Sequence, residues 1–290
     1  MDSWMPRRWE VLLTAALLLP VGPVAAQDGP IEMADDPFEI ADPIAAAPGS
    51  AEAAFVGLYE RARTGRIRGT AAAETELEFG LAPRLEVRLG QSGAYGNLET
   101  RRRLGSGLDL TDSEGSGAAA EADAGERANW GGTSQIGAMY QLTDDSGAMP
   151  AVGLLGRLRA LYGPGRTGYE AEGVALIGKT LIGGARPLGA HLNLGWTARI
   201  DPQPGERSGR YLLNASIGQT ITHDTALVVT YALSQQQRGD RDYSLVQAGF
   251  RHRLSATGTV IGVAAGIGLN RDSPRFQLAL AVQWSINGGR

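Results

Sequence analysis

Apolar residues occupy every second position over several stretches of this chain. Between Pro187 and Asp201 the even-numbered positions are apolar, and the odd-numbered ones are small or polar. The same alternation runs from Phe276 to Ile286. Because successive side chains of a strand point to opposite faces, this period predicts strands with one apolar face and one wetter face.

Nine further stretches repeat the pattern less regularly, and Gly168–Thr180 fits it least. A stretch of this kind is long enough to cross a bilayer, since a tilted strand needs about 9 to 11 residues to do so. Short links such as Ala82-Pro83 alternate with longer polar ones, as periplasmic turns alternate with outer loops. The first and last strands must both have their free ends on the periplasmic side, which requires an even number of strands. A twelfth strand is therefore expected, and Ala53–Arg63 is the candidate. The predicted fold is all-β: a closed antiparallel transmembrane β-barrel of about 12 strands over residues 53–290, with a long loop at 92–131.

The first 26 residues resemble a secretory signal. Arg7 and Arg8 precede an apolar run from Val11 to Leu19, and Val24–Ala26 supplies small residues for cleavage. A single helical anchor is the alternative, but this run is too short to span about 30 Å of hydrocarbon. Residues 27–52 are rich in Ala, Pro, Asp and Gly without a period, which predicts a flexible periplasmic lead before the barrel.

Composition narrows the function classes. The formal net charge of −4 lacks the basic excess of a nucleic-acid-binding chain, so no nucleic-acid partner is expected. With no cysteine, an exported chain has neither disulfides nor a thiolate site. After the signal no window of about 18 residues is continuously apolar, so any passage through a membrane must use strands.

If the apolar faces contact lipid, the opposite faces line the lumen. Acidic residues of early strands and basic residues of later ones would then set a field across the lumen that weights solutes by charge. Alternatively, these charges pair and fill a narrow barrel. The residues expected to line the lumen are Glu74, Glu76, Glu78, Glu86, Arg88, Arg157, Arg159, His191, Asn193, Arg199, Arg210, Gln247, Arg251 and Arg253. The residues expected at the membrane interface are Trp196, Tyr211, Tyr243 and Trp284.

Catalysis finds little support in these residues. The chain has three histidines, His191, His223 and His252, and none has a motif-spaced carboxylate or metal-site spacing. A Gly-x-Ser-x-Gly elbow is absent as well. We therefore expect no enzyme, no metal and no cofactor.

Four segments resemble the outer-membrane transporter family named for the meta-pathway of phenol degradation. Glu76–Glu86 is similar to the opening hairpin of that family, Leu192–Gly195 to its central strand and Gly266–Pro274 to its last loop, with Trp130–Ser134 in addition. The resemblance implies a barrel and transport. One departure is the C-terminus, because such chains usually end in an aromatic residue that the barrel assembly machinery reads, whereas here Ile286–Arg290 follow Trp284.

These observations predict a channel in the outer membrane of a Gram-negative cell for passive passage of small molecules, including aromatic or hydrophobic compounds. Its expected partners are outer-membrane lipid, the barrel assembly machinery and a small-molecule solute. The alternative is a structural or surface-interaction barrel with a plugged lumen.

Overall fold

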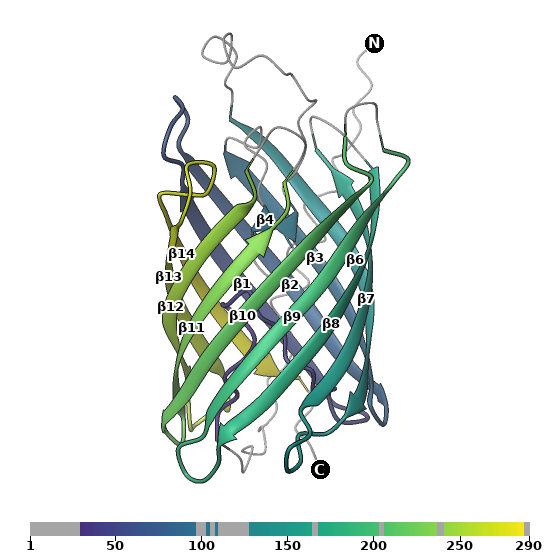
Figure 1. Ribbon diagram of the computed structural model, residues 1–290, viewed down its shortest axis with the longest axis vertical. Helices are drawn as coiled ribbons and strands as arrows, with labels where there is room; N and C mark the ends of the chain where they lie inside the picture. Colours follow the sequence, from purple (N-terminus) through teal and green to yellow (C-terminus); the bar gives the residue numbers. More distant parts are fainter. Residues whose placement is uncertain are drawn as a thin grey trace, which may run out of the picture.

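The computed structural model describes residues 30–96, 103–104, 108–109, 128–163, 168–202, 206–236 and 241–286. Within these ranges, twelve antiparallel strands join into one closed barrel (Figure 1), so the predicted fold class is confirmed. Its strands are β1 (Ala51–Arg61), β2 (Gly69–Ala82), β3 (Leu85–Gly96), β6 (Asn129–Thr143), β7 (Ala151–Tyr162), β8 (Gly168–Ile182), β9 (Leu188–Ile200), β10 (Gly209–Thr222), β11 (Thr225–Ser234), β12 (Tyr243–Arg253), β13 (Val260–Gly268) and β14 (Phe276–Ser285). Two short strands, β4 (Arg103–Leu104) and β5 (Leu108–Asp109), pair with each other in a separate two-stranded sheet.

The barrel closes where β1 meets β14. These strands pair from Glu52 opposite Ser285 to Arg61 opposite Phe276. The other side of β1 pairs with β2. Because the ring is complete, the barrel has no strand edge with unpaired N–H and C=O groups, which hydrocarbon could not solvate. The candidate first strand is therefore real, although it begins at Ala51.

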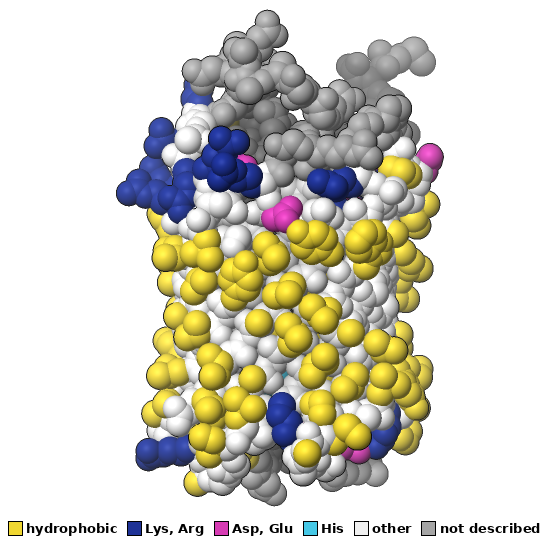
Figure 2. Space-filling view, in the orientation of Figure 1, with side chains coloured by type: hydrophobic (Ala, Val, Ile, Leu, Met, Phe, Trp, Pro, Cys, Tyr) yellow, Lys and Arg dark blue, Asp and Glu magenta, His cyan; other side chains and the backbone are white. Residues whose placement is uncertain are grey.

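Alternation along each strand separates an apolar outside from a polar inside. On β7, Leu154 and Leu158 are 50% and 57% exposed, whereas Arg157 and Arg159 are 5% and 2% exposed. The outer surface carries a broad belt of hydrophobic side chains around the barrel (Figure 2). Among the described residues, no helix is long and apolar enough to cross a membrane.

The two ends of the barrel differ in the length of their links. At one end the strands are joined by the links 83–84, 144–150, 183–187, 223–224 and 254–259, and β1 begins and β14 ends there. We call this the short-turn end, which is the lower end in Figure 1. The opposite, long-link end carries 62–68, 97–128, 163–167, 201–208, 235–242 and 269–275.

The longest link is shorter than the sequence predicts. β3 and β6 stay paired from Leu85 opposite Tyr140 to Gly96 opposite Asn129, so both ends of the expected 92–131 loop belong to strands. Most of residues 97–128 lie outside the described ranges, as do residues 1–29. The roles of the loop and of the signal at residues 1–26 therefore stay predictions.

The sequence predicts a flexible periplasmic lead over residues 27–52. The structure corrects this for residues 30–50, which lie folded inside the barrel. Ile31 N donates to His223 O at 3.1 Å at the short-turn end. The chain then reaches Phe38, which is fully buried among inward residues of β1, β2, β3, β11, β13 and β14. It returns to the same end, where Gly49 N donates to Gly80 O at 2.8 Å. We call residues 30–50 the luminal segment.

Glycines on the inner wall make room for the luminal segment. A Cβ on Gly80 would collide with the carbonyl oxygen of Ala47, and one on Gly262 would collide with the ring of Pro37. A Cβ on Gly218 would lie 2.8 Å from Cβ of Met33. These wall positions therefore need the close backbone approach that only glycine allows.

Candidate functional site

The lumen holds a cluster of arginines and glutamates on β7 to β10. Arg159 Nη2 lies 2.9 Å from Glu172 Oε1, and Arg157 Nη1 lies 3.6 Å from the same oxygen. Both side chains of the Arg159–Glu172 pair are fully buried. Thr197 Oγ1 also donates to Glu172, at 2.9 Å. Glu172 thus links β7 and β9 across β8.

A second glutamate of β8, Glu170, lies close to two further arginines. Arg210 Nη2 lies 2.6 Å from Glu170 Oε1, and Arg199 Nη1 lies 3.6 Å from it. We call these six residues, Arg157, Arg159, Glu170, Glu172, Arg199 and Arg210, the arginine-rich cluster. The four arginines were predicted from the sequence, but the two glutamates were not. In the strand register Arg157 lies directly opposite Glu172, and Arg159 opposite Glu170.

An acid-rich cluster lies on the neighbouring part of the wall. Arg88 of β3 lies at its centre, 2.5 Å from Glu86, 2.8 Å from Glu78 and 3.2 Å from Glu76. Gln135 Nε2 of β6 donates to Glu76 at 2.9 Å and to Glu74 at 3.2 Å. Four glutamates therefore share one arginine and one amide.

The two clusters have opposite charge balance. The arginine-rich cluster has four arginines and two glutamates, and the acid-rich cluster has four glutamates and one arginine. The ion pairs that a structural role requires are present, yet each cluster keeps an excess of one sign. Because β2, β3 and β6 adjoin β7 to β10, this arrangement places a field along one part of the inner wall, where charges act more strongly than in bulk water.

Several predicted lumen residues hold the luminal segment in place. Arg251 of β12 donates to the carbonyl oxygens of Glu32, at 3.1 Å, and of Ala34. Glu86 accepts a hydrogen bond from Ala46 N at 2.8 Å. With its amide oriented to satisfy both atoms, Asn193 accepts from Ala41 N at 2.7 Å and donates to Ala41 O at 3.2 Å. The wall therefore binds mainly backbone groups of the segment.

The remaining predicted lumen residues also face inward. Arg253 lies 3.1 Å from Asp224 at the short-turn end. Gln247 is buried, accepts from Thr230 Oγ1 at 3.1 Å and donates to Gln277. His191 is half-buried, with Nδ1 3.4 Å from Ser216 Oγ. Their part in selectivity stays a prediction.

Tyr243 was expected at the membrane interface, and the structure corrects this. Its side chain is 1% exposed and points into the barrel, where the hydroxyl lies 3.4 Å from Glu39 and from Glu60. Tyr243 lies an even number of residues before the inward Gln247, so the alternation of β12 itself places it inside, and its aromatic type misled the prediction. Trp196, Tyr211 and Trp284 do face outward, and their interfacial role stays a prediction.

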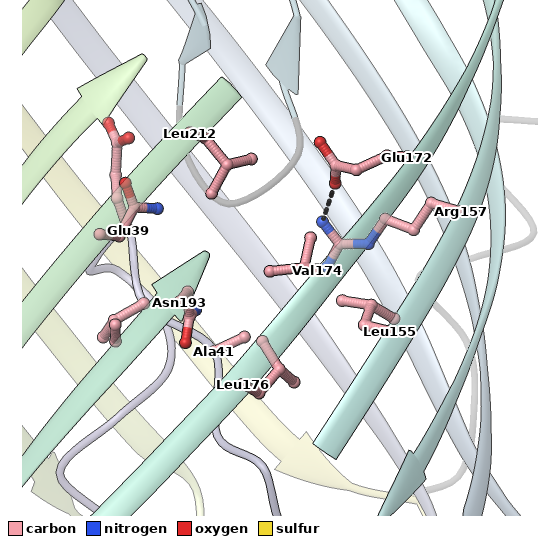
Figure 3. A pocket seen from close by; sticks show the side chains of 11 residues that line it. Glu39, Ala41, Leu155, Arg157, Glu172, Val174, Leu176, Asn193 and Leu212 are labelled. Carbon is pink, nitrogen blue, oxygen red and sulfur yellow. Dashed lines mark ion pairs between the residues drawn. The ribbon is translucent and has the colours of Figure 1, made fainter. Parts of the chain in front are cut away.

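A small cavity separates the luminal segment from the wall beside the arginine-rich cluster (Figure 3). Its volume is about 30 Å³. Since one water needs at least about 10 to 15 Å³, this gap accommodates about two waters and no organic solute. It is lined by Glu39, Ile40, Ala41, Leu155, Arg157, Glu172, Val174, Leu176, Asn193, Leu212 and Asn214.

The histidines have partners other than a catalytic set. His252 Nδ1 lies 2.9 Å from Thr225 Oγ1, and His223 Nδ1 lies 3.0 Å from Asp224 in an exposed turn. Over the described ranges, no group of three or more His, Cys, Asp or Glu side chains could hold a metal ion.

The chain is similar to known proteins in its fold but not in its sequence. No protein-family model matches the chain, and no curated protein matches its sequence. An outer membrane channel from Pseudomonas putida F1 is 15% identical, covers 84% of this chain and 98% of its own, and superposes with a TM-score of 0.53. The toluene transporters TodX of P. putida (10% identity, 89% and 95% covered, TM-score 0.42) and TbuX of Ralstonia pickettii (9%, 83% and 90%, 0.39) are more distant. At such identities the likeness to the first channel concerns the fold alone.

Proposed function

We propose that this chain is an outer-membrane channel for passive passage of small molecules, closed in the present state by its luminal segment. One observation carries the proposal: a closed barrel has an apolar outer belt and an inner wall of buried charged and polar side chains. That distribution suits a protein with lipid outside and a polar passage within. The shared fold with an outer membrane channel supports the same conclusion.

The way the luminal segment is held also favours passage. Arg251, Asn193 and Glu86 bind its backbone N–H and C=O groups, and water can replace such hydrogen bonds when the segment leaves. The inner wall that would then be uncovered carries many polar and charged side chains beside two smaller apolar clusters. Displacement would therefore open a lumen whose wall is partly polar and partly apolar.

A structural barrel with a filled lumen is the second candidate. The water-sized cavity and the fully buried Phe38 favour it, because both are features of a packed interior. The two candidates differ in what removal of the luminal segment should do. A channel should conduct, whereas a structural barrel should lose stability or stay silent.

Removal of residues 30–50 tests the proposal in planar bilayers and in solute-loaded liposomes. We expect the variant to show discrete conductance at least tenfold above that of the full mature chain. Liposome swelling with arabinose and with benzoate would then separate neutral polar from anionic aromatic solutes. A matched control replaces residues 30–50 with a Gly/Ser sequence of equal length, which keeps the chain length but removes every anchor.

Either outcome of this experiment is informative. Conductance in both the deletion and the Gly/Ser variant supports passage through the lumen. If both variants fold, as judged by β-type circular dichroism and heat-shifted gel mobility, yet neither conducts, passage is rejected and the structural barrel remains.

A further inference from the structure

Exposed arginines crowd one sector of the long-link end. They lie on the β1–β2, β11–β12 and β13–β14 links and the adjoining strand ends, which surround the closure between β1 and β14. In Figure 2, basic side chains gather at this end, beyond the hydrophobic belt. We call the following seven residues the basic rim: Arg61, Arg63, Arg66, Arg68, Arg241, Arg271 and Arg275.

Hydrogen bonds join the three links into one surface. Arg275 N donates to Arg61 O at 2.7 Å, which ties the β13–β14 link to the end of β1. Arg63 reaches across to Gly268 O at 2.6 Å and Asn270 O at 3.1 Å. Arg241 N donates to Asp272 Oδ2 at 3.1 Å. These backbone and side-chain hydrogen bonds hold the three links together before any partner binds.

The three links hold more arginines than acids. Their described residues include two aspartates, Asp242 and Asp272, and a third, Asp240, lies outside the described ranges. Asp272 lies 3.4 Å from Arg271 Nε, whereas Asp242 accepts hydrogen bonds from Tyr211 and from Gln236 N, at 3.4 Å. The seven arginines of the rim therefore outnumber the three aspartates of these links, which gives this sector an excess of basic residues.

The short-turn end differs in charge. There Arg84 lies 2.5 Å from Asp144, and Lys179 lies 2.5 Å from Asp145. Partial burial opposes ionisation of Asp145, but hydrogen bonds from Lys179 and Thr180 outweigh it and hold the pKa of Asp145 below its ordinary value. Arg84 and Lys179 at this end therefore have carboxylate partners, whereas the basic rim combines seven arginines with fewer acids.

The height of the rim on the barrel matches that of lipid headgroups. Register places Arg61 opposite Phe276, and the ring of Phe276 lies 6.0 Å from that of Tyr59 on the outer surface. Leu278 and Leu280 follow on β14 and are about half exposed. Aromatic residues mark the boundary of the hydrocarbon in membrane barrels. Arg61 and its neighbours thus begin where the apolar belt ends.

Arginine suits phosphate better than lysine does, because its planar fork donates two parallel hydrogen bonds. Lys179 is the only lysine among 27 basic residues of this chain, and it lies at the opposite end. We infer that the basic rim binds the phosphate groups of lipid headgroups in the leaflet that the long-link end faces. This inference rests on the proposed outer-membrane location.

Native mass spectrometry of the full, delipidated mature chain in detergent tests the inference. The probe is bis-phosphorylated lipid A, compared with the same lipid after removal of both phosphates. The rim variant carries Arg61→Gln, Arg271→Gln and Arg275→Gln. The matched control carries Arg84→Gln, Lys179→Gln and Arg186→Gln, which removes the same charge from the short-turn end.

We expect the rim variant to raise the apparent Kd for bis-phosphorylated lipid A at least tenfold, and removal of the phosphates to do the same for the unaltered chain. The control should stay within twofold. Replacing the same three rim arginines with lysine should restore part of the affinity, since lysine keeps the charge but not the fork.

Three results would overturn the inference: equal affinity in the rim variant and the unaltered chain, equal loss in the control, or equal binding of phosphate-free lipid. Binding of inorganic phosphate as tight as that of lipid A would also overturn it, by showing an anion site without lipid preference. If the rim variant fails to fold, the comparison of the two lipids on the unaltered chain decides. A chain that binds lipid A but never conducts would reject the channel and leave the rim intact.

Discussion

Arg159 shows what a single inward position requires in this barrel. It lies between two outward residues, Leu158 and Ala160, yet its own side chain is fully buried and paired with Glu172. A buried charge is tolerated only with a close partner, because its desolvation is costly. The buried pair and the surface pair Arg84–Asp144 therefore differ in their expected contribution to stability.

Replacement of Glu172 by Gln should destabilise the barrel by about 3 kcal/mol, since it leaves Arg157 and Arg159 buried without their shared carboxylate. Asp144→Asn, which breaks an exposed pair, should cost less than about 1 kcal/mol. Urea unfolding in detergent micelles measures both free energies of unfolding. Equal losses in the two variants would show that the lumen is wet enough to solvate these arginines.

At the residue scale, alternation identified most inward charges but not their partners. The lumen residues expected on β2, β3, β7, β9 and β10 do face inward, because the period of a strand is local and visible in the sequence. Glu170 and Glu172 were missed, and Tyr243 was assigned outward. The first error arose because β8 lacks clear alternation. The second arose because Tyr243 was assigned by its aromatic type, although the alternation of β12 places it inside.

At the element scale, β8 explains why its pattern was weak. Its inward side chains change from Glu170 and Glu172 to Val174 and Leu176 along the strand. The apolar pair packs with Ala41 of the luminal segment. A strand that faces charge at one end and an apolar plug at the other cannot keep a polar/apolar alternation. Gly168–Thr180 is therefore irregular because part of its inward face packs against the luminal segment.

The luminal segment and β10 offer a site for a covalent lock. In the double variant Met33→Cys/Gly218→Cys the two Cβ atoms would begin 2.8 Å apart. The luminal segment would have to move by about 1 Å to relieve this contact and reach disulfide geometry. The chain has no other cysteine. Oxidation should abolish channel openings in planar bilayers, and a reductant should restore them.

Each single-cysteine variant serves as the control for this lock, because it receives the same redox treatment without a possible crosslink within the chain. Openings that persist in the fully crosslinked protein would show that solutes pass without movement of the luminal segment at Met33.

At the scale of the whole molecule, the barrel and the luminal segment are separable. All twelve strands pair in a closed ring that uses no residue of the segment. The segment contributes Phe38 and Ile40 to the interior, together with backbone groups that bind the wall. We therefore expect a change in the free energy of docking the segment to leave the free energy of unfolding of the barrel strands nearly unchanged.

Phe38→Ala should weaken docking by about 3 kcal/mol, the usual cost of truncating a buried aromatic side chain. Its expected result is increased conductance with little change in the thermal midpoint of the barrel. Phe55→Ala is the matched control, because Phe55 faces outward on β1 and makes no luminal contact. A large fall in the thermal midpoint without conductance would favour the structural barrel.

The sequence by itself determined the architecture of the barrel. The features that did so are the period of two, the length of the alternating stretches and the alternation of short and long links. They predicted the antiparallel barrel, its strand count and the inward face of most strands, because these features follow from local backbone geometry. Tertiary structure alone decided how the lumen is filled. Residues 30–50 have no period, and their place depends on contacts with strands far along the chain, such as those of Ala34 with Arg251 and Ala41 with Asn193. Those contacts exist only once the ring has closed around the segment.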